Sequence, residues 1–222
     1  MRNGANAHFE WPHNLERLSY HGRMKLPEAF HGHPVCLVIW IITFGFCVVP
    51  EFVRSQKLRA GHGAQKSDKG SELVVILAAN FALLAGFVSA VVFPGFSIAS
   101  DWKPIFEAGI VIWLSGTIFR WYSIRTLGRF FTYDVAVSND QPVVEQGPYR
   151  WLRHPSYLGS LLAMIGYGMT LTNWLTIFLP ALCLGAAYAY RIHVEEQALL
   201  QGLGPLYHEY MKRTWRLIPF VF

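Results

Sequence analysis

A polar run with chemically capable side chains lies at the start of a long uncharged segment. Between residues 147 and 157 the sequence places two arginines, a histidine, two tyrosines and two prolines. Charged groups at the edge of an apolar segment need partners or a ligand, because an unpaired buried charge is costly. We therefore expect a polar pocket at this point and place the chemistry of the protein in it.

A second charged cluster, Arg191 with Glu195 and Glu196, closes the same uncharged segment. Arg191 and Glu195 are four residues apart, so on a helix they share a face. One interpretation is a salt bridge along the helix, and the other is an anion-binding guanidinium that the carboxylate orients. His154, which precedes a proline suited to a helix start, is likewise either a capping residue or a pocket residue.

The composition is typical of an integral membrane protein. Hydrophobic residues make up 53% of the 222 residues and charged residues only 15%, against roughly 25% in ordinary soluble domains. The mean hydropathy is +0.28. The net charge of +5 fits basic residues that flank membrane spans, and we see no RNA-binding motif. We therefore predict membrane lipid, and no nucleic acid, as a partner.

Apolar runs predict an all-α integral membrane protein with about five transmembrane helices. Roughly 20 apolar residues suffice to cross a bilayer, and the first three candidate spans lie at residues 35–50, 73–100 and 105–124. Arg120, near the end of the third, is interpreted as a side chain that extends to the membrane surface rather than as a catalytic group. These spans follow a polar segment at residues 1–34.

The remaining two spans form a predicted short helical hairpin. Residues 155–190 contain no charge and are too many for one ordinary helix, and turn-forming residues at 170–174 divide them. Residues 191–213 mix charged and apolar side chains, which predicts a C-terminal amphipathic helix leaving the membrane, interrupted near residues 202–205.

The distribution of Lys and Arg predicts the orientation of these helices. Fourteen of the 19 lie on the side that holds the loop 54–70, the segment 120–153 and the tail from residue 191. Basic residues favour the cytoplasmic side. We therefore predict a multi-pass protein whose C-terminus and active site are cytoplasmic.

The sequence lacks the common cofactor and metal motifs. It contains no glycine-rich dinucleotide fingerprint, P-loop, His-Glu-x-x-His or Cys-x-x-Cys motif, so any nucleotide-like cofactor requires a pocket unlike a Rossmann fold. The three cysteines lie in apolar stretches and have no metal spacing. Five N-terminal histidines also lack a regular ligand spacing, and we predict no metal site among them: His8, His13, His21, His31 and His33.

The order and spacing of several motifs in residues 127–222 resemble the isoprenylcysteine carboxyl methyltransferase family of integral membrane methyltransferases. The matching elements are Leu127-Gly128-Arg129-Phe130-Phe131-Thr132, Val143-Val144, Gly147-Pro148-Tyr149-Arg150, Arg153-His154-Pro155-Ser156-Tyr157, Arg191 with Glu195-Glu196, Tyr207 with Tyr210, and Leu217-Ile218-Pro219.

This resemblance implies a cytoplasm-facing pocket for S-adenosylmethionine, built from the segment before the hairpin and the first turn after it. Arg191 would face the acceptor and act with Glu195 as the catalytic pair. The cofactor-binding residues that the resemblance implies are Gln141, Val143, Val144, Tyr149, Arg153, His154, Pro155, Ser156, Tyr157 and Glu195.

The expected function is methyl transfer to a lipophilic acceptor, with a carboxylate as the first choice. Such an acceptor is already nucleophilic, so the enzyme mainly positions the reactants and excludes water. A prenylated substrate or another lipophilic small molecule fits, and a phenol, thiol or amine acceptor would need a base such as Glu195, Glu196 or His154. Two further alternatives are an NADPH-dependent reductase and a non-enzymatic membrane scaffold.

These expectations divide the chain into three parts. Residues 1–34 form a polar N-terminal segment, residues 35–126 form the first transmembrane helices, and residues 127–222 form the methyltransferase core with the cofactor pocket.

Overall fold

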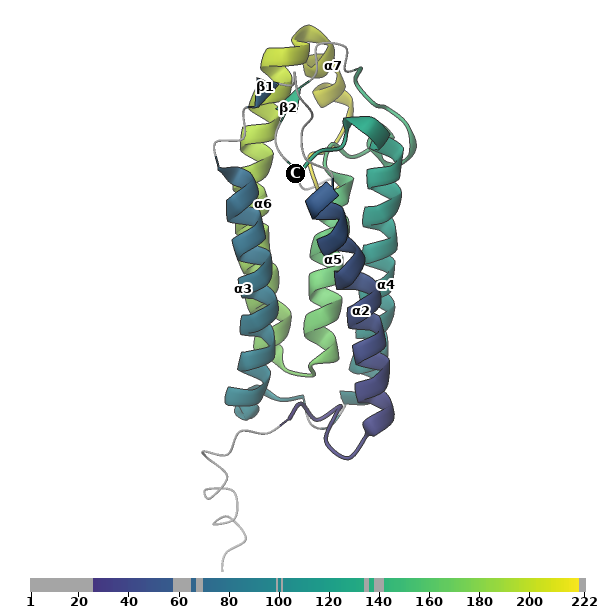
Figure 1. The fold of residues 1–222 in the computed structure, drawn as a ribbon, viewed down its shortest axis with the longest axis vertical. Helices are drawn as coiled ribbons and strands as arrows, with labels where there is room; N and C mark the ends of the chain where they lie inside the picture. Colours follow the sequence, from purple (N-terminus) through teal and green to yellow (C-terminus); the bar gives the residue numbers. More distant parts are fainter. Residues whose placement is uncertain are drawn as a thin grey trace, which may run out of the picture.

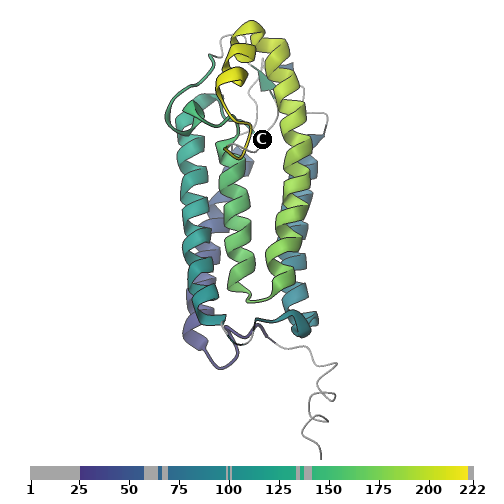
Figure 2. The same ribbon diagram turned by 180° about the vertical axis from the view of Figure 1, so that it is seen from behind.

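In the computed structural model, long helices run side by side and carry a smaller layer of short elements and loops at one end (Figure 1). The structure describes residues 26–57, 65–66, 70–98, 100, 102–133, 136–137 and 142–219. The long helices of this part are α2 (Pro34–Lys57), α3 (Ser71–Val92), α4 (Trp102–Leu127), α5 (Pro155–Thr170) and α6 (Trp174–Leu203), followed by the short α7 (Pro205–Arg213). The same view from behind shows α4, α5 and α6 in a row (Figure 2).

Short elements accompany these helices. Single 3-10 turns occur at Pro94–Phe96, Gly128–Phe130 and Gly147–Arg150. The all-α expectation needs one small correction, because β1 (Gln65–Lys66) pairs antiparallel with β2 (Ala136–Val137). This two-residue ladder joins the loop before α3 to the loop after α4.

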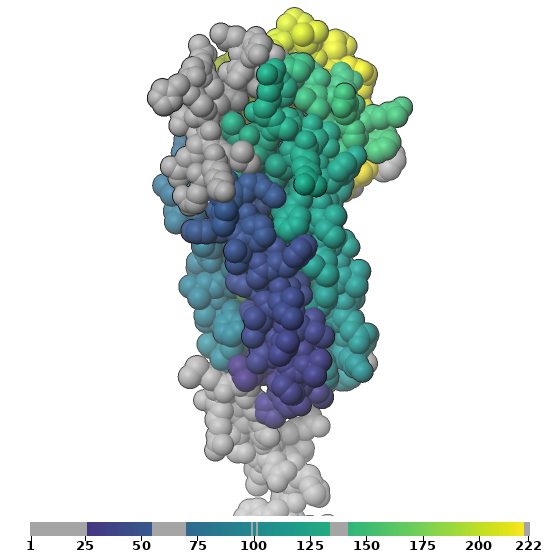
Figure 3. All heavy atoms as spheres, turned by 45° about the vertical axis from the view of Figure 1, so that its right-hand side comes forward, coloured from purple at the N-terminus to yellow at the C-terminus, as the bar shows by residue number. Residues whose placement is uncertain are grey.

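The outer surface of the bundle is apolar, as a membrane protein requires. Three helical stretches of the described residues are long and apolar enough to cross a bilayer: Pro34–Arg54, Ser71–Val92 and Trp174–Leu203. Large apolar side chains point outward from all three, and Ile42, Leu84 and Leu182 are 66%, 64% and 71% exposed. Such continuous apolar exposure is unusual on a soluble protein and fits contact with lipid. The space-filling view shows the outer face of α2 between α3 and α4 (Figure 3).

Glycines allow α4 and α5 to pack with their backbones in contact. A Cβ atom on Gly116 would lie 2.5 Å from the Ala163 backbone nitrogen, and one on Gly166 would lie 2.3 Å from that of Trp113. Close approach at small residues is a common way for membrane helices to associate. It places the C-terminal half of α4 directly against the start of α5.

The predicted hairpin is present, with its turn at residues 171–173. Asn173 caps α6 by accepting a hydrogen bond from the Leu175 backbone nitrogen at 2.9 Å. The Thr176 hydroxyl donates to the Gly168 carbonyl across the turn at 2.7 Å. The Asn173 and Thr176 side chains therefore stabilise this turn, which explains why the uncharged stretch folds back instead of continuing as one helix.

The end of the hairpin differs from the sequence expectation. Residues 191–203 do not begin a separate amphipathic helix, because α6 continues without a break to Leu203. The break comes at Gly204, with φ 55°, and Pro205 starts α7. No Gly or Pro interrupts residues 191–201, so nothing stops the helix there. Arg191 and Glu195 consequently lie within α6.

The segment after α7 returns to the start of α5. The Trp215 backbone nitrogen donates to the Trp151 carbonyl at 2.9 Å, and Arg153 and His154 donate from their backbone nitrogens to Trp215 and Arg216 at 2.9 and 3.1 Å. We call residues 214–216 the C-terminal strap. It fixes the backbone of the polar run in front of α5.

Candidate active site

The polar run before α5 is folded into a compact turn that buries several of its side chains, Tyr149 and His154 among them. Gly147, with φ 55°, opens the 3-10 turn Gly147–Arg150. Pro155 is the first residue of α5, as predicted, and His154 stands immediately before it. Because the strap holds the backbone at residues 153 and 154, the His154 ring, only 4% exposed, has a fixed direction.

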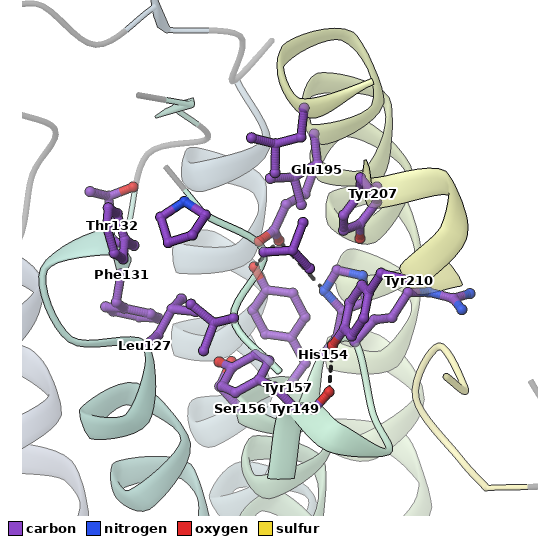
Figure 4. A pocket seen from close by; sticks show the side chains of 17 residues that line it. Leu127, Phe131, Thr132, Tyr149, His154, Ser156, Tyr157, Glu195, Tyr207 and Tyr210 are labelled. Carbon is purple, nitrogen blue, oxygen red and sulfur yellow. Dashed lines mark hydrogen bonds and ion pairs between the residues drawn. The ribbon is translucent and has the colours of Figure 1, made fainter. Parts of the chain in front are cut away.

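A cavity lies beneath this turn (Figure 4). Its walls come from the end of α4, the segment after it, the polar run, the end of α6 and α7. Residues named from the sequence that line it are Val143, Val144, Tyr149, Arg153, His154, Ser156, Tyr157 and Glu195. Pro155 starts α5 but does not line the cavity, and the prediction for Gln141 falls outside the described residues. Further lining residues, not named as site residues from the sequence, include Phe131, Thr132, Leu199, Tyr207 and Tyr210.

The hairpin brings His154 and Glu195 together although 41 residues separate them. The Tyr157 hydroxyl donates to Glu195 Oε2 at 2.7 Å, and His154 Nδ1 lies 3.8 Å from the same oxygen. The His154 and Tyr157 rings stack with centroids 5.6 Å apart. The cavity thus combines one carboxylate, one imidazole and aromatic faces, a set suited to a ligand that carries both cationic and aromatic groups.

Arg153 lines the cavity and is held by several contacts of its guanidinium. Its Nε donates to Glu196 Oε1 at 2.8 Å, and Nη1 donates to the Met211 carbonyl at 3.0 Å. Glu196 also lies 3.4 Å from His154 Nε2 and pairs with Arg216 Nη2 at 2.9 Å. Arg153 therefore lines the cavity while its guanidinium ties the polar run to α6 and α7.

A second, larger cavity extends between the helices towards the opposite end of the bundle. Most of its lining is apolar, with Val75, Leu83 and Met164 as examples. Its polar lining includes residues from several helices: Glu51, Glu72, Arg120, Tyr133, Tyr157 and Arg191. The two cavities share Phe131, Thr132 and Tyr157 in their walls, so they meet at these residues.

Arg191 belongs to the larger cavity and contacts the smaller one through Tyr157. Its Nε donates to the Tyr157 hydroxyl at 3.3 Å, Nη1 donates to Ser71 Oγ at 3.0 Å, and Nη2 donates to the Tyr133 carbonyl. Since Tyr157 also donates to Glu195, its hydroxyl links the arginine to the carboxylate that the sequence pairs with it.

Arg120 also lines the larger cavity, although the sequence analysis gave it no place in the site. Instead of extending to the membrane surface, its side chain is only 11% exposed and pairs with Glu51 of α2. Its Nη1 also donates to the Ser156 carbonyl at 3.3 Å, at the start of α5. The sequence signal that could have found it is an arginine beside a span that is otherwise uncharged for twelve residues.

Burial sets the protonation of the phenols around the smaller cavity. It raises the pKa of Tyr149, and the neighbouring Glu195 carboxylate raises it further. Burial likewise raises the pKa of Tyr207, with contributions from Glu196 and Glu195. Both phenols therefore stay neutral at physiological pH and act as hydrogen-bonding walls rather than as bases.

The described residues contain no group of three His, Cys, Asp or Glu side chains that could hold a metal ion. His8, His13 and His21 fall outside the described part of the chain.

Comparison with known proteins identifies relatives in sequence. Residues 109–201 match the model of the isoprenylcysteine carboxyl methyltransferase (ICMT) family. The chain is 33% identical over 165 residues to protein-S-isoprenylcysteine O-methyltransferase B of Arabidopsis thaliana, covering 72% of this chain and 82% of that protein. It is 30% identical over 167 residues to a probable protein-S-isoprenylcysteine O-methyltransferase of Oryza sativa, covering 73% and 86%.

This chain is also similar to a solved structure of the same family. The eukaryotic intramembrane Ras methyltransferase ICMT superposes with a TM-score of 0.55 at 31% identity, over 66% of this chain and 52% of that one.

Proposed function

Because this chain belongs to the isoprenylcysteine carboxyl methyltransferase family and is a membrane methyltransferase, we propose that it methylates the carboxylate of a prenylated cysteine. The methyl donor in this proposal is S-adenosylmethionine. Family membership removes the scaffold and reductase alternatives. The observation that carries the proposal is the position of Tyr157, which lines both cavities between Glu195 and Arg191.

The smaller cavity suits the methyl donor, whose sulfonium supplies the methyl group. Glu195 can accept hydrogen bonds from its ammonium group or ribose hydroxyls, and His154 can meet its carboxylate. Tyr149 and Tyr157 offer aromatic faces for the adenine or the sulfonium. Val143 and Val144 line the same cavity. Because the strap and Glu196 fix the polar run, these groups are positioned before the donor arrives.

The larger cavity suits the acceptor. Its apolar walls between the helices can hold a prenyl chain, and its polar end presents the guanidinium groups of Arg191 and Arg120. Two arginines can bind one carboxylate with the planar geometry that this group prefers. The acceptor oxygen would then lie beside Tyr157, where the two cavities meet. As its new bond to the methyl carbon forms and the bond to sulfur breaks, the carboxylate becomes a neutral ester.

We further propose five membrane crossings, with the smaller cavity on the cytoplasmic side. The α4 helix and the 16-residue α5 would complete the bundle formed by the three apolar spans. In this arrangement residues 127–222 form the donor-binding core, residues 35–126 contribute walls to the acceptor cavity, and residues 1–34 precede both. A cysteine placed at Glu209, which is 63% exposed on α7, should react with a membrane-impermeant maleimide only after the cells are permeabilised. Labelling in intact cells would place the site outside.

A titration of the purified protein tests the donor. S-adenosylmethionine and its demethylated product should bind, and NADPH should not. Transfer of a labelled methyl group to a prenylated cysteine with a blocked amine should then yield an alkali-labile ester. Binding of NADPH alone, or no transfer to any prenylcysteine, would contradict the proposed function.

The Arg191→Lys variant tests the acceptor. Lysine keeps the charge but lacks the planar fork, so turnover of the acid should fall while donor binding is largely kept. If lipophilic phenols or thiols are the better acceptors, their rate should instead rise with pH through the pKa of the acceptor or base. Full activity of Arg191→Ala on the best acceptor would remove Arg191 from the mechanism.

A further inference from the structure

Glu51 is a carboxylate that the protein itself places on a proposed acceptor-binding arginine. It lies near the cytoplasmic end of α2, and its Oε1 accepts from Arg120 Nε at 2.9 Å and from the Tyr133 hydroxyl at 2.8 Å. Its Oε2 is buried without a hydrogen-bond partner, 3.9 Å from Arg54 Nη1. Both Glu51 and Arg120 line the larger cavity.

The pair resembles the contact that an acceptor would make. An incoming prenylcysteine presents the same chemical group as Glu51, in the same cavity, to the same guanidinium. Two carboxylates close to each other repel and compete for a shared cation. The acceptor carboxylate can therefore pair with Arg120 only if Glu51 releases Arg120 at least in part.

The reaction then removes one of the two competitors. Before methyl transfer the polar end of the cavity holds the acceptor carboxylate together with Glu51, and after transfer it holds a neutral ester. A buried guanidinium that loses its anion is strongly destabilised, so Arg120 again needs a counter-ion once the ester has formed. Glu51 is the nearest carboxylate, already within hydrogen-bonding distance.

We propose that Glu51 is a placeholder counter-ion for Arg120, which the acceptor carboxylate displaces and which pairs with Arg120 again as methylation removes the acceptor's charge. This inference rests on the proposed function. Its consequence is that Glu51 weakens binding of the acid but favours the change from acid to ester. Glu51 repels the charged carboxylate of the bound acceptor, and this repulsion is relieved as methylation removes the charge. The relief lowers the free-energy barrier between the bound acid and the transition state.

The Glu51→Gln variant of the full-length protein tests this role. The dissociation constant of a prenylcysteine acid, measured without methyl donor, should fall roughly tenfold, because a competing charged hydrogen bond is removed. The kcat with saturating donor should fall by a similar factor, so that kcat/KM changes little. The dissociation constant of the neutral carboxamide of the same prenylcysteine should stay nearly constant.

Glu145→Gln is a matched control. Glu145 also forms a carboxylate–guanidinium pair, with Arg213 at 3.0 Å, but it is exposed and lines neither cavity. This variant should leave the acid and carboxamide constants unchanged. If Glu51→Gln does not fold, Glu51→Asp is the alternative, because it keeps the charge but shortens the reach of the carboxylate to Arg120. It should lower the dissociation constant of the acid and the kcat by smaller factors than Glu51→Gln.

Two results would overturn the inference. Weaker binding of the acid, or equal changes for acid and carboxamide, would make Glu51 a structural residue that merely holds α2 against α4. These results are distinct from a failure of the proposed function, in which the wild-type protein methylates no prenylcysteine at all.

Discussion

Replacing Tyr157 with Phe should uncouple the donor side of the site from the acceptor side. The substitution removes one hydroxyl, which donates to Glu195 Oε2 at 2.7 Å and accepts from Arg191 Nε at 3.3 Å. The ring itself is retained, and its stacking on Tyr188, with centroids 4.5 Å apart, does not depend on the hydroxyl. We therefore expect the variant to fold and to insert normally.

The size of the effect follows from these two distances. A 2.7 Å bond to a carboxylate is short enough to be a strong charge-assisted hydrogen bond, whereas 3.3 Å is longer than a typical N–H···O contact. The loss of stabilising free energy should therefore come mainly from the hydrogen bond to Glu195. A hydrogen bond to a charged group contributes about 1.5–3 kcal/mol, so about 2 kcal/mol corresponds to roughly a thirtyfold fall in kcat/KM.

Two measurements check this prediction. Isothermal titration calorimetry gives the affinity for S-adenosylmethionine, and transfer of a labelled methyl group gives kcat/KM for the prenylated acceptor. Both should fall in Tyr157→Phe. Tyr122→Phe is the matched control, since Tyr122 is 52% exposed on α4 and lines neither cavity. If Tyr157→Phe keeps both values within about twofold of wild type, the hydroxyl does not connect the two ligands and our reasoning fails.

Three further predictions concern affinity, packing and pH. His154→Ala and Glu195→Gln should each lose roughly ten- to a hundredfold in donor affinity while remaining folded; unchanged titrations in both would give these residues a structural role. Gly166→Ala should destabilise the fold by about 1–3 kcal/mol because its Cβ would meet the Trp113 backbone at 2.3 Å, whereas Gly45→Ala, with nothing within 4 Å, should not; equal thermal unfolding midpoints would refute this. Burial raises the pKa of Tyr149, so the unfolded chain releases this proton first, and stability should decline as pH rises above about 10; an unfolding midpoint that is constant to higher pH would contradict it.

The sequence predicted features that depend on nearby residues. The break of the hairpin at residues 171–173 follows from local turn chemistry, and the start of α5 follows from Pro155. The separate helix expected from Arg191 was wrong because mixed charge alone does not end a helix, whereas Gly204 does. In each of these cases the deciding residue lies within a few positions of the element that it shapes.

Contacts between distant helices could not be predicted in the same way. Glu51 and Arg120 are 69 residues apart on different helices, and no local pattern indicates that they meet. The contact between Arg153 and Glu196 was also hidden, because the two residues are 43 positions apart and come close only when the hairpin folds. From the sequence alone, an arginine in such a motif can equally bind a ligand or hold the backbone.

The C-terminal strap also implies an order of events during biosynthesis. Residues 153 and 154 donate their backbone hydrogen bonds to residues 215 and 216, which leave the ribosome after every helix of the bundle. Since chains fold from the N-terminus as they are made, the helices can enter the bilayer well before the polar run finds its partners. A nascent chain that stops shortly after α7 should therefore be inserted in the membrane, yet unable to retain the methyl donor.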